Sequence, residues 1–348
     1  MLKSHIEPGH IVFGTVVRNA PVRQGGELVL LDWKKKQVVK RIPIFPDNPR
    51  MDDDPNPRGN TRGCKGISIV GQEIVAANFH TLQIFDFDLR HKRDFSHGLL
   101  VGLHETFNEA ENRIWVASTV IDSAVEYDLS TGKMLNVFCP RELASFHEAL
   151  ELEPGGIDLD ADNRRLFLTD DHLKSSSHLH LNAVTVSNGN VYALFHRFGA
   201  ICNLTTGEVI IRDKNLVRGH NLVFLNDHTV VTNDTYGRTV RIYDLESRQQ
   251  IKAINLLDFD WVRQLKRRAE IRNLPGKILG RLKLTKEGVS RPIFVRGLAR
   301  KDDMLYVGLS PAAILCINWQ SGELLDAFQY SSNPRACVHG LALLPNTI

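Results

Sequence analysis

The stretch GELVLLDWKKKQVVKRIPI (residues 26–44) is the first of six copies of one design. In each copy a short apolar run ends in a turn built on Asp or Asn, and a second run follows at once. The other copies are HTLQIFDFDLRHKRDF (80–95), DSAVEYDLSTGKMLNVF (122–138), GAICNLTTGEVIIRD (199–213), RTVRIYDLESRQQIKAI (238–254) and AAILCINWQSGELLDAF (312–328). A single hairpin cannot bury its apolar faces alone, so the copies must stack against one another.

A second pair of apolar runs lies upstream of the hairpins and completes four strands per unit, as in KGISIV and EIVAANF (65–79). The first unit lacks its innermost strand, because only HIVFGTVV (10–17) precedes it. The missing strand reappears at the end of the chain as VHGLALLP (338–345). The sequence therefore predicts an all-β, six-bladed β-propeller, in which residues 338–345 and 10–44 form one composite blade that closes the ring.

Composition is typical of a globular protein, with 43% hydrophobic and 24% charged residues, and we expect a single β-propeller domain over residues 1–348. No apolar run is long enough for a membrane span, and the N-terminal segment has no apolar core of a signal peptide. The five cysteines lack metal-type spacing, which favours reduced thiols and a cytoplasmic location. The net charge of +3 gives no reason to expect a nucleic-acid partner.

Three insertions interrupt the regular spacing, each between the outermost strand of one blade and the innermost strand of the next. They are residues 46–62, 141–178 and 257–291, and we expect all three over the mouth of the central channel. Residues 257–291 begin with basic and apolar side chains at helical spacing. This basic helical insertion suits a lid helix with a solvated basic face or a docking site for a partner protein. Residues 141–178 contain DLDADNRR, which lacks the glycine and distal glutamate of a calcium loop. The longer segment GGIDLDADNRRLFLTDD (155–171) is better explained as a β-hairpin, so a seventh, partial blade remains an alternative.

Ionisable side chains stand where the inner strands begin, and four of the six are histidine in a chain with only 14. They are Lys65, His104, His180, His220, Arg296 and His339. Neutral imidazole is a common ligand for zinc, iron and similar divalent metals, so the four histidines are the candidate metal ligands. Two alternatives remain. Each histidine bonds its own backbone carbonyl around a water-filled channel, or the histidines act as acids and bases without a metal.

Loops between the second and third strands of the blades open on the same face. They supply Arg18, Arg23, His80, Asp122, His196, Arg197, Asn233, Asp234 and Ser310. A lining of His, Arg and Asp suits an anionic or polyhydroxylated small molecule. The predicted substrate-binding residues from both sets are Lys65, His80, His196, Arg197, Asp234 and Arg296.

Three segments resemble the repeated motifs of an uncharacterised bacterial propeller family, in which HLNGLA, a PHSP-type segment and RGLAF followed by YVGLS occur in that order. The segments are HLNAVTV (180–186), RGHNLVF (218–224) and FVRGLARKDDMLYVGLS (294–310), and the resemblance spans residues 178–345. It points to His180, Asn182, His220, Arg296 and Gly297, while Asn221 and Leu222 replace the family's Ser-Pro. The blades more distantly resemble gluconolactonase and strictosidine synthase propellers, which implies metal-assisted hydrolysis or condensation at the channel mouth.

Two functions of different class follow. In the first, the chain is a cytosolic, metal-dependent hydrolase or lyase/isomerase acting on a small polar or anionic metabolite, with His180, His220 and Arg296 as catalytic residues. In the second, it is a non-catalytic binding or scaffolding propeller that docks a partner protein, with residues 257–291 contributing. The sequence contains no nucleotide-binding loop, nucleophile elbow or HExxH motif that decides between them.

Overall fold

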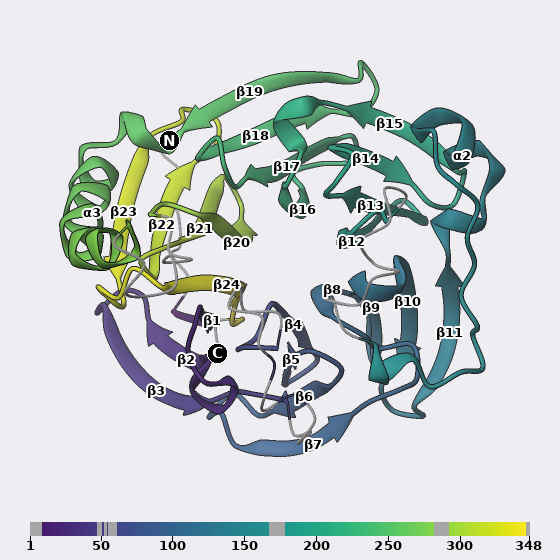
Figure 1. The fold of residues 1–348 in the computed structure, drawn as a ribbon, viewed down its shortest axis with the longest axis horizontal. Coiled ribbons are helices and arrows are strands. Elements are labelled where there is room, and N and C mark those ends of the chain that lie inside the picture. The colour runs from purple at the N-terminus through teal and green to yellow at the C-terminus, as the bar shows by residue number, and fades with distance from the viewer. Residues whose placement is uncertain are drawn as a thin grey trace, which may run out of the picture.

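The computed structural model describes residues 9–46, 51, 54, 61–166, 178–281 and 292–345. The described residues form six four-stranded antiparallel sheets arranged as blades around a central axis (Figure 1). The predicted six-bladed β-propeller is therefore confirmed. The segment considered for a seventh blade contributes no strand within its described part and instead forms the short helix η4 (Asn163–Arg165).

The four strands of each blade run from the axis to the rim. The innermost strands are β4 (Gly66–Val70), β8 (Leu103–Ala110), β12 (Leu181–Ser187), β16 (His220–Phe224), β20 (Val295–Lys301) and β24 (Ala336–Leu343). The second strands are β1 (His10–Val17), β5 (Glu73–Ala77), β9 (Arg113–Ser118), β13 (Asn190–Phe195), β17 (Thr229–Asp234) and β21 (Met304–Leu309).

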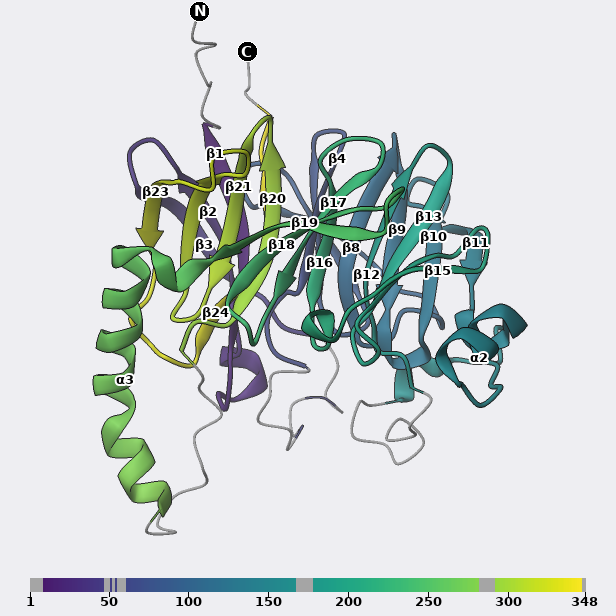
Figure 2. The same ribbon diagram turned by 90° about the horizontal axis from the view of Figure 1, so that it is seen from above.

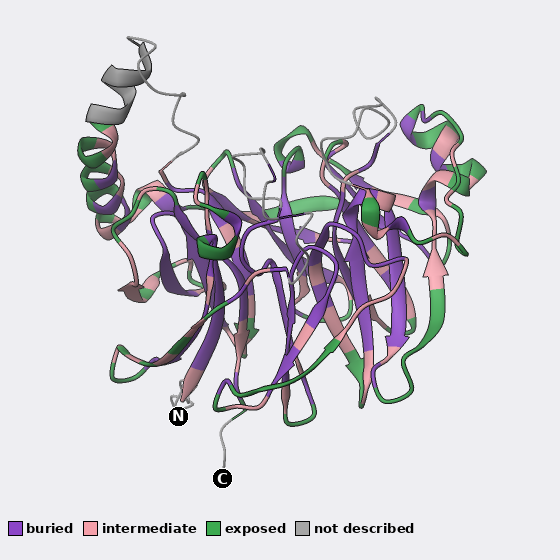
Figure 3. Ribbon diagram, turned by 60° about the horizontal axis from the view of Figure 1, so that its bottom comes forward, coloured by how far each residue is buried: buried purple, intermediate pink, exposed green. Residues whose placement is uncertain are grey.

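The third strands are β2 (Glu27–Asp32), β6 (Leu82–Phe85), β10 (Ser123–Asp128), β14 (Ala200–Asn203), β18 (Thr239–Asp244) and β22 (Ala313–Asn318). The outermost strands are β3 (Gln37–Pro43), β7 (His91–Phe95), β11 (Lys133–Phe138), β15 (Glu208–Arg212), β19 (Gln249–Asn255) and β23 (Leu324–Gln329). Burial is greatest in the second and third strands, such as β17 and β21, and is lowest in the outermost strands, since β7 and β11 are largely exposed (Figure 3). The other short helices are η1 (Val22–Gln24), η2 (Thr119–Ile121), η3 (Pro140–Glu142), η6 (Lys214–Leu216) and η7 (Leu256–Asp258).

The two ends of the chain close the ring. β24 pairs with β1 in an antiparallel register that places Val16 opposite Cys337 and Val12 opposite Ala342, so the composite blade is confirmed. β1 begins and β24 ends on one face of the ring (Figure 2), and the inner strands therefore begin on the opposite face. We call that opposite end of the axis the channel mouth.

Each pair of neighbouring blades shares its own apolar core. Between the last blade and the composite blade, Trp33 and Tyr306 are both fully buried and meet edge to face, with ring centroids 5.4 Å apart. Edge-to-face aromatic pairs add to the free energy gained from burial alone. Because every interface is a small core of this kind, a ring of this size needs no single large one.

Two insertions lie elsewhere than expected. Helix α2 (Ala144–Leu150) and helix α3 (Asp260–Arg281) stand at the outer edge of the ring, α3 beside β23 (Figure 1), and not over the channel mouth. The reason is apolar packing, since Val262 and Leu265 of α3 join the core of the adjacent blades. Residues 167–177, 282–291 and most of 46–62 lie outside the described residues. Within the described chain, no helix combines the length and apolarity that a bilayer crossing needs.

Candidate metal centre

Five histidine rings form a closed circuit at the channel mouth. Ring centroids lie 5.3 Å apart for His104 and His180, 4.4 Å for His180 and His196, and 5.2 Å for His196 and His220. The circuit closes with 5.6 Å between His220 and His339 and 5.9 Å between His339 and His104. Four of the rings come from the starts of inner strands, as predicted, and His196 follows β13.

β-Bulges occur in five of the six inner strands near their first residues. β8 pairs Leu103 with Ser118 and then Thr106 with Val116, so His104 and Glu105 together oppose one residue. Corresponding register shifts occur in β12, β16, β20 and β24, whereas β4 pairs regularly. A bulge interrupts the alternation of a strand and re-aims its side chains. Glu105 lies in such a bulge, and it accepts a hydrogen bond from Asn221 of β16, two blades away.

The protonation of His104 follows from its contacts. Its Nδ1 lies 2.7 Å from Thr119 Oγ1 and 3.1 Å from the carbonyl oxygen of Gly102. The Thr119 hydroxyl donates to the carbonyl of Leu181 in the next blade, at 2.7 Å, and so accepts from the ring. Nδ1 therefore carries the proton of the neutral imidazole, and Nε2 carries a free lone pair.

His220 repeats this arrangement two blades further along. Its Nδ1 lies 2.9 Å from Thr235 Oγ1 and 3.1 Å from the carbonyl of Arg218. The Thr235 hydroxyl donates at 3.0 Å to the carbonyl of Val295, again in the following blade. Nε2 of His220 is therefore also the unprotonated nitrogen.

His339 has the same tautomer for a simpler reason. Its Nδ1 donates to the carbonyl of Lys65, at 3.1 Å, because a carbonyl can only accept. Its Nε2 accepts a hydrogen bond from Nη1 of Arg296 at 2.7 Å. The lone pair of His339 is thus held by a guanidinium.

These three histidines also lie closest together at their nitrogens. One ring nitrogen from each of His104, His220 and His339 lies within 4.8 Å of the other two. In a tetrahedral zinc site with zinc–nitrogen bonds of about 2.0–2.1 Å, ligand nitrogens are separated by about 3.3 Å, so movements of about 1 Å would suffice. Burial, together with nearby Lys65 or Arg296, lowers the pKa of all three histidines well below its usual value. The rings are therefore neutral, the form that binds a metal.

His180 and His196 belong to the circuit but not to this close trio. His180 precedes β12 in the left-handed conformation, with φ 55°, and its backbone N–H donates to Asp122 at 2.8 Å. Asp122 is buried and also accepts from the N–H groups of Leu179 and Leu181. Burial raises the pKa of Asp122 and lowers the pKa of His196 to about 3. Asp122 is thus a structural anchor for the segment that carries His180.

Two cations complete the cluster. Lys65 is 5% exposed, and burial, with the nearby Arg296 guanidinium, lowers its pKa to about 7. Arg296 contacts His339, and no described residue forms a hydrogen bond with its Nε. Among the described residues, neither Lys65 nor Arg296 forms an ion pair with a carboxylate. The site therefore carries uncompensated positive charge beside neutral imidazoles.

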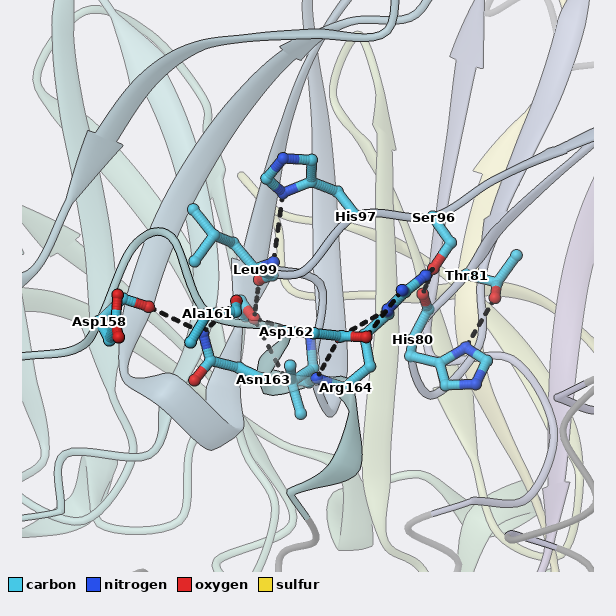
Figure 4. A network of polar contacts seen from close by, with 12 residues as sticks. His80, Thr81, Ser96, His97, Leu99, Asp158, Ala161, Asp162, Asn163 and Arg164 are labelled. Carbon is cyan, nitrogen blue, oxygen red and sulfur yellow. Dashed lines mark hydrogen bonds and ion pairs between the residues drawn. The ribbon is translucent and has the colours of Figure 1, made fainter.

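Three predicted substrate-binding residues lie outside the histidine circuit. His80 bonds Thr81 and belongs to a network in which Ser96 and Arg164 fasten residues 158–166 to the blade of β4–β7 (Figure 4). The carboxylate of Asp234 accepts from Arg241 and from the N–H of Gly237.

Arg197 is exposed and donates to the carbonyl of His178. Substrate roles for His80, Asp234 and Arg197 stay predictions.

Three further residues beside the histidines were not among those predicted from the sequence, namely Glu105, Thr119 and Thr235. Burial raises the pKa of Glu105 to about 8, and its side chain accepts a hydrogen bond from Asn221. The signal for the threonines is present in the chain, since AST (117–119) and NDT (233–235) follow equivalent second strands. The role of these threonines becomes visible only in the structure, where each hydroxyl forms a hydrogen bond with a histidine of its own blade.

Comparisons with known proteins support the fold and give no information on function. No protein-family model matches the chain, and no curated protein matches it. A crystal structure of a protein of unknown function from Bacteroides caccae superposes with a TM-score of 0.56 over 96% of this chain and 98% of that one. The two sequences are 10% identical, so the likeness supports the propeller architecture and leaves the motif-based family relationship a resemblance.

Proposed function

We propose that this protein is a metal-dependent enzyme whose metal is bound at the channel mouth by Nε2 of His104, His220 and His339. The observation that carries the proposal is the shared tautomer of the three rings. Each donates its Nδ1–H to protein oxygen, which is how metal-binding histidines are usually oriented.

The arrangement is harder to explain if each histidine merely fills its own position. In that case the second ring nitrogen of each histidine would face only channel water, and nothing would bring nitrogens from three different blades within 4.8 Å of one another. Nε2 of His104 and Nε2 of His220 make no hydrogen bond to a described residue. Two unprotonated nitrogens that face each other and a third across the ring axis are suited to share a cation.

A metal held by three protein ligands keeps at least one position open, where it polarises a carbonyl or lowers the pKa of a bound water. The chain's own residues would supply the rest of the chemistry. Lys65 and Arg296 would bind an anionic group of the substrate. His180, half-buried and neutral beside His104, would accept a proton. Hydrolysis or lyase/isomerase chemistry on a small metabolite suits this set of groups best.

Metal content tests the proposal directly. Protein purified without a histidine tag, as isolated and after incubation with zinc, iron(II) or cobalt(II), should contain about one ion per chain by elemental analysis. His220→Ala and His339→Ala should lose the ion. His228→Ala, at a half-exposed position beside Asp244, should keep it. Equal, negligible metal in all four proteins would contradict the proposal and leave the non-catalytic binding propeller as the better hypothesis.

Activity is the second arm of the test. Metal-loaded protein should hydrolyse or cleave at least one member of a panel of lactones, esters and hydroxy or oxo acids, and His220→Ala should not. If the protein binds one metal ion per chain but shows no turnover with any substrate, the proposed metal site is supported and the proposed enzymatic activity is refuted.

A further inference from the structure

Arg296 forms a hydrogen bond with the same nitrogen of His339, Nε2, that would bind the proposed metal. Its Nη1 donates to Nε2 of His339 at 2.7 Å. An imidazole nitrogen has one lone pair, so it cannot accept from Arg296 and bind a metal at the same time. His339 can therefore join His104 and His220 around a metal only after the guanidinium leaves.

The guanidinium is held weakly where it is. Its partner is a neutral imidazole, and its buried Nε has no hydrogen-bond partner in the described part of the chain. The guanidinium carbon lies 5.6 Å from the centroid of the Phe294 ring. No carboxylate among the described residues pairs with it. Burying a charge without a counterion costs free energy, so an anion that reaches this position gains both charge pairing and hydrogen bonds.

A second and a third cation lie around the same position. Lys65 is buried, and His339 donates to its backbone carbonyl. Burial is the main cause that lowers the pKa of His104, His180 and His339, and the charge of Lys65 adds to it in each case. Arg18 stacks on the Phe294 ring at 4.4 Å, the ring that Arg296 also approaches. Three cations that converge beside three neutral metal-type ligands match a ligand with an oxyanion group, such as a carboxylate, sulfate or phosphate.

We infer that the site binds a small oxyanion together with the metal and that Arg296 couples the two. In the structure Arg296 caps His339. When an oxyanion enters, the guanidinium pairs with it and releases Nε2 of His339 to the metal. The inference rests on the proposed metal site and deepens it, because it assigns the substrate an oxyanion group. Coupling of this kind is reciprocal, so the oxyanion must tighten metal binding by the factor by which the metal tightens oxyanion binding.

The test is a cobalt(II) titration of metal-stripped, tag-free protein, followed by absorbance in buffers of equal ionic strength containing chloride, sulfate or acetate. Sulfate and acetate bind cobalt weakly in solution and present the two oxyanion shapes. Wild type should bind cobalt at least about 5-fold more tightly in sulfate or in acetate than in chloride. The more effective anion distinguishes a tetrahedral oxyanion from a carboxylate.

Variants at Arg296 make the coupling specific. Arg296→Met keeps most of the apolar stem and frees His339, so it should bind cobalt tightly in chloride and show no further gain from either anion. Arg300→Met changes the other arginine of β20, which is exposed and bonds the carbonyl of Phe224. This variant leaves the contact of His339 intact and should retain the wild-type response.

Two outcomes would overturn the coupling. Either wild type binds cobalt equally in all three buffers, or Arg296→Met retains the anion effect. Absence of cobalt binding in every buffer and variant would instead refute the proposed metal site itself, so the two failures are distinguishable.

Discussion

Thr119 connects His104 of its own blade to the next blade. Its hydroxyl accepts from Nδ1 of His104 at 2.7 Å and donates to the carbonyl of Leu181 in the next blade at 2.7 Å. Thr235 makes the equivalent bridge between His220 and Val295. These hydroxyls fix both the tautomer and the direction of each ring. The tautomer of each histidine therefore depends on how its blade packs against the next blade.

Removing either hydroxyl should weaken metal binding. In Thr119→Val or Thr235→Val the ring loses its acceptor and can rotate or change tautomer, and we expect a loss of about 10–100-fold in metal affinity. Competition with a chromogenic chelator would measure it. Thr239→Val removes a buried hydroxyl of the same blade as Thr235 but distant from the rings, and should change affinity little. An equal loss in Thr239→Val would mean that the effect is general destabilisation.

Closure of the ring by β24 predicts that the C-terminus is indispensable. Deletion of residues 337–348 removes the strand that pairs with β1 and leaves two sheet edges unpaired. We expect insoluble protein or loss of the cooperative thermal transition. A soluble truncated chain that melts at the wild-type temperature would contradict the role assigned to β24.

Stability should depend on pH through Lys65. Burial lowers its pKa to about 7, so between about pH 7 and its ordinary value near 10.4 the folded chain binds fewer protons than the unfolded chain. Unfolding free energy therefore rises with pH across this window, by at most about 1.4 kcal/mol per pH unit from this group, and the penalty is complete below about pH 7.

Lys65→Met removes the titrating amine, so it should stabilise the metal-free protein more at about pH 6.5 than at about pH 9. Urea unfolding in chloride buffer at the two pH values would show the difference. Lys133→Met, at an exposed position of β11, serves as the control. The same gain at both pH values would show that Lys65 is not desolvated in solution.

Asp122 should be one of the costliest carboxylates to remove. It is buried and accepts from the backbone N–H groups of Leu179, His180 and Leu181. Asp122→Ala leaves those donors without an acceptor, and we expect a loss of about 2–3 kcal/mol in unfolding free energy. Asp86→Ala removes a carboxylate that also accepts from two backbone N–H groups, but in an exposed turn, and should cost clearly less. Comparable losses in the two variants would argue against the anchoring role.

The sequence by itself determined the ring. Six hairpins of one design, each with alternating apolar residues, can bury their faces only by stacking, and the unpaired first blade required a strand from the far end of the chain. It also placed His104, His180, His220 and His339 at the starts of inner strands, because strand periodicity is local and readable.

Only the tertiary structure decided what those side chains do. Bulges near the starts of β8, β16, β20 and β24 re-aim side chains by breaking the local alternation, and no residue pattern within one strand announces them. The tautomers depend on hydroxyls and carbonyls from other strands. The contact between Arg296 and His339 joins residues 43 positions apart. Likewise α3 went to the rim because its apolar face packs on an outer core, a preference that its basic composition concealed. Period-2 patterning specifies the blades, whereas hydrogen bonds between distant strands specify the site.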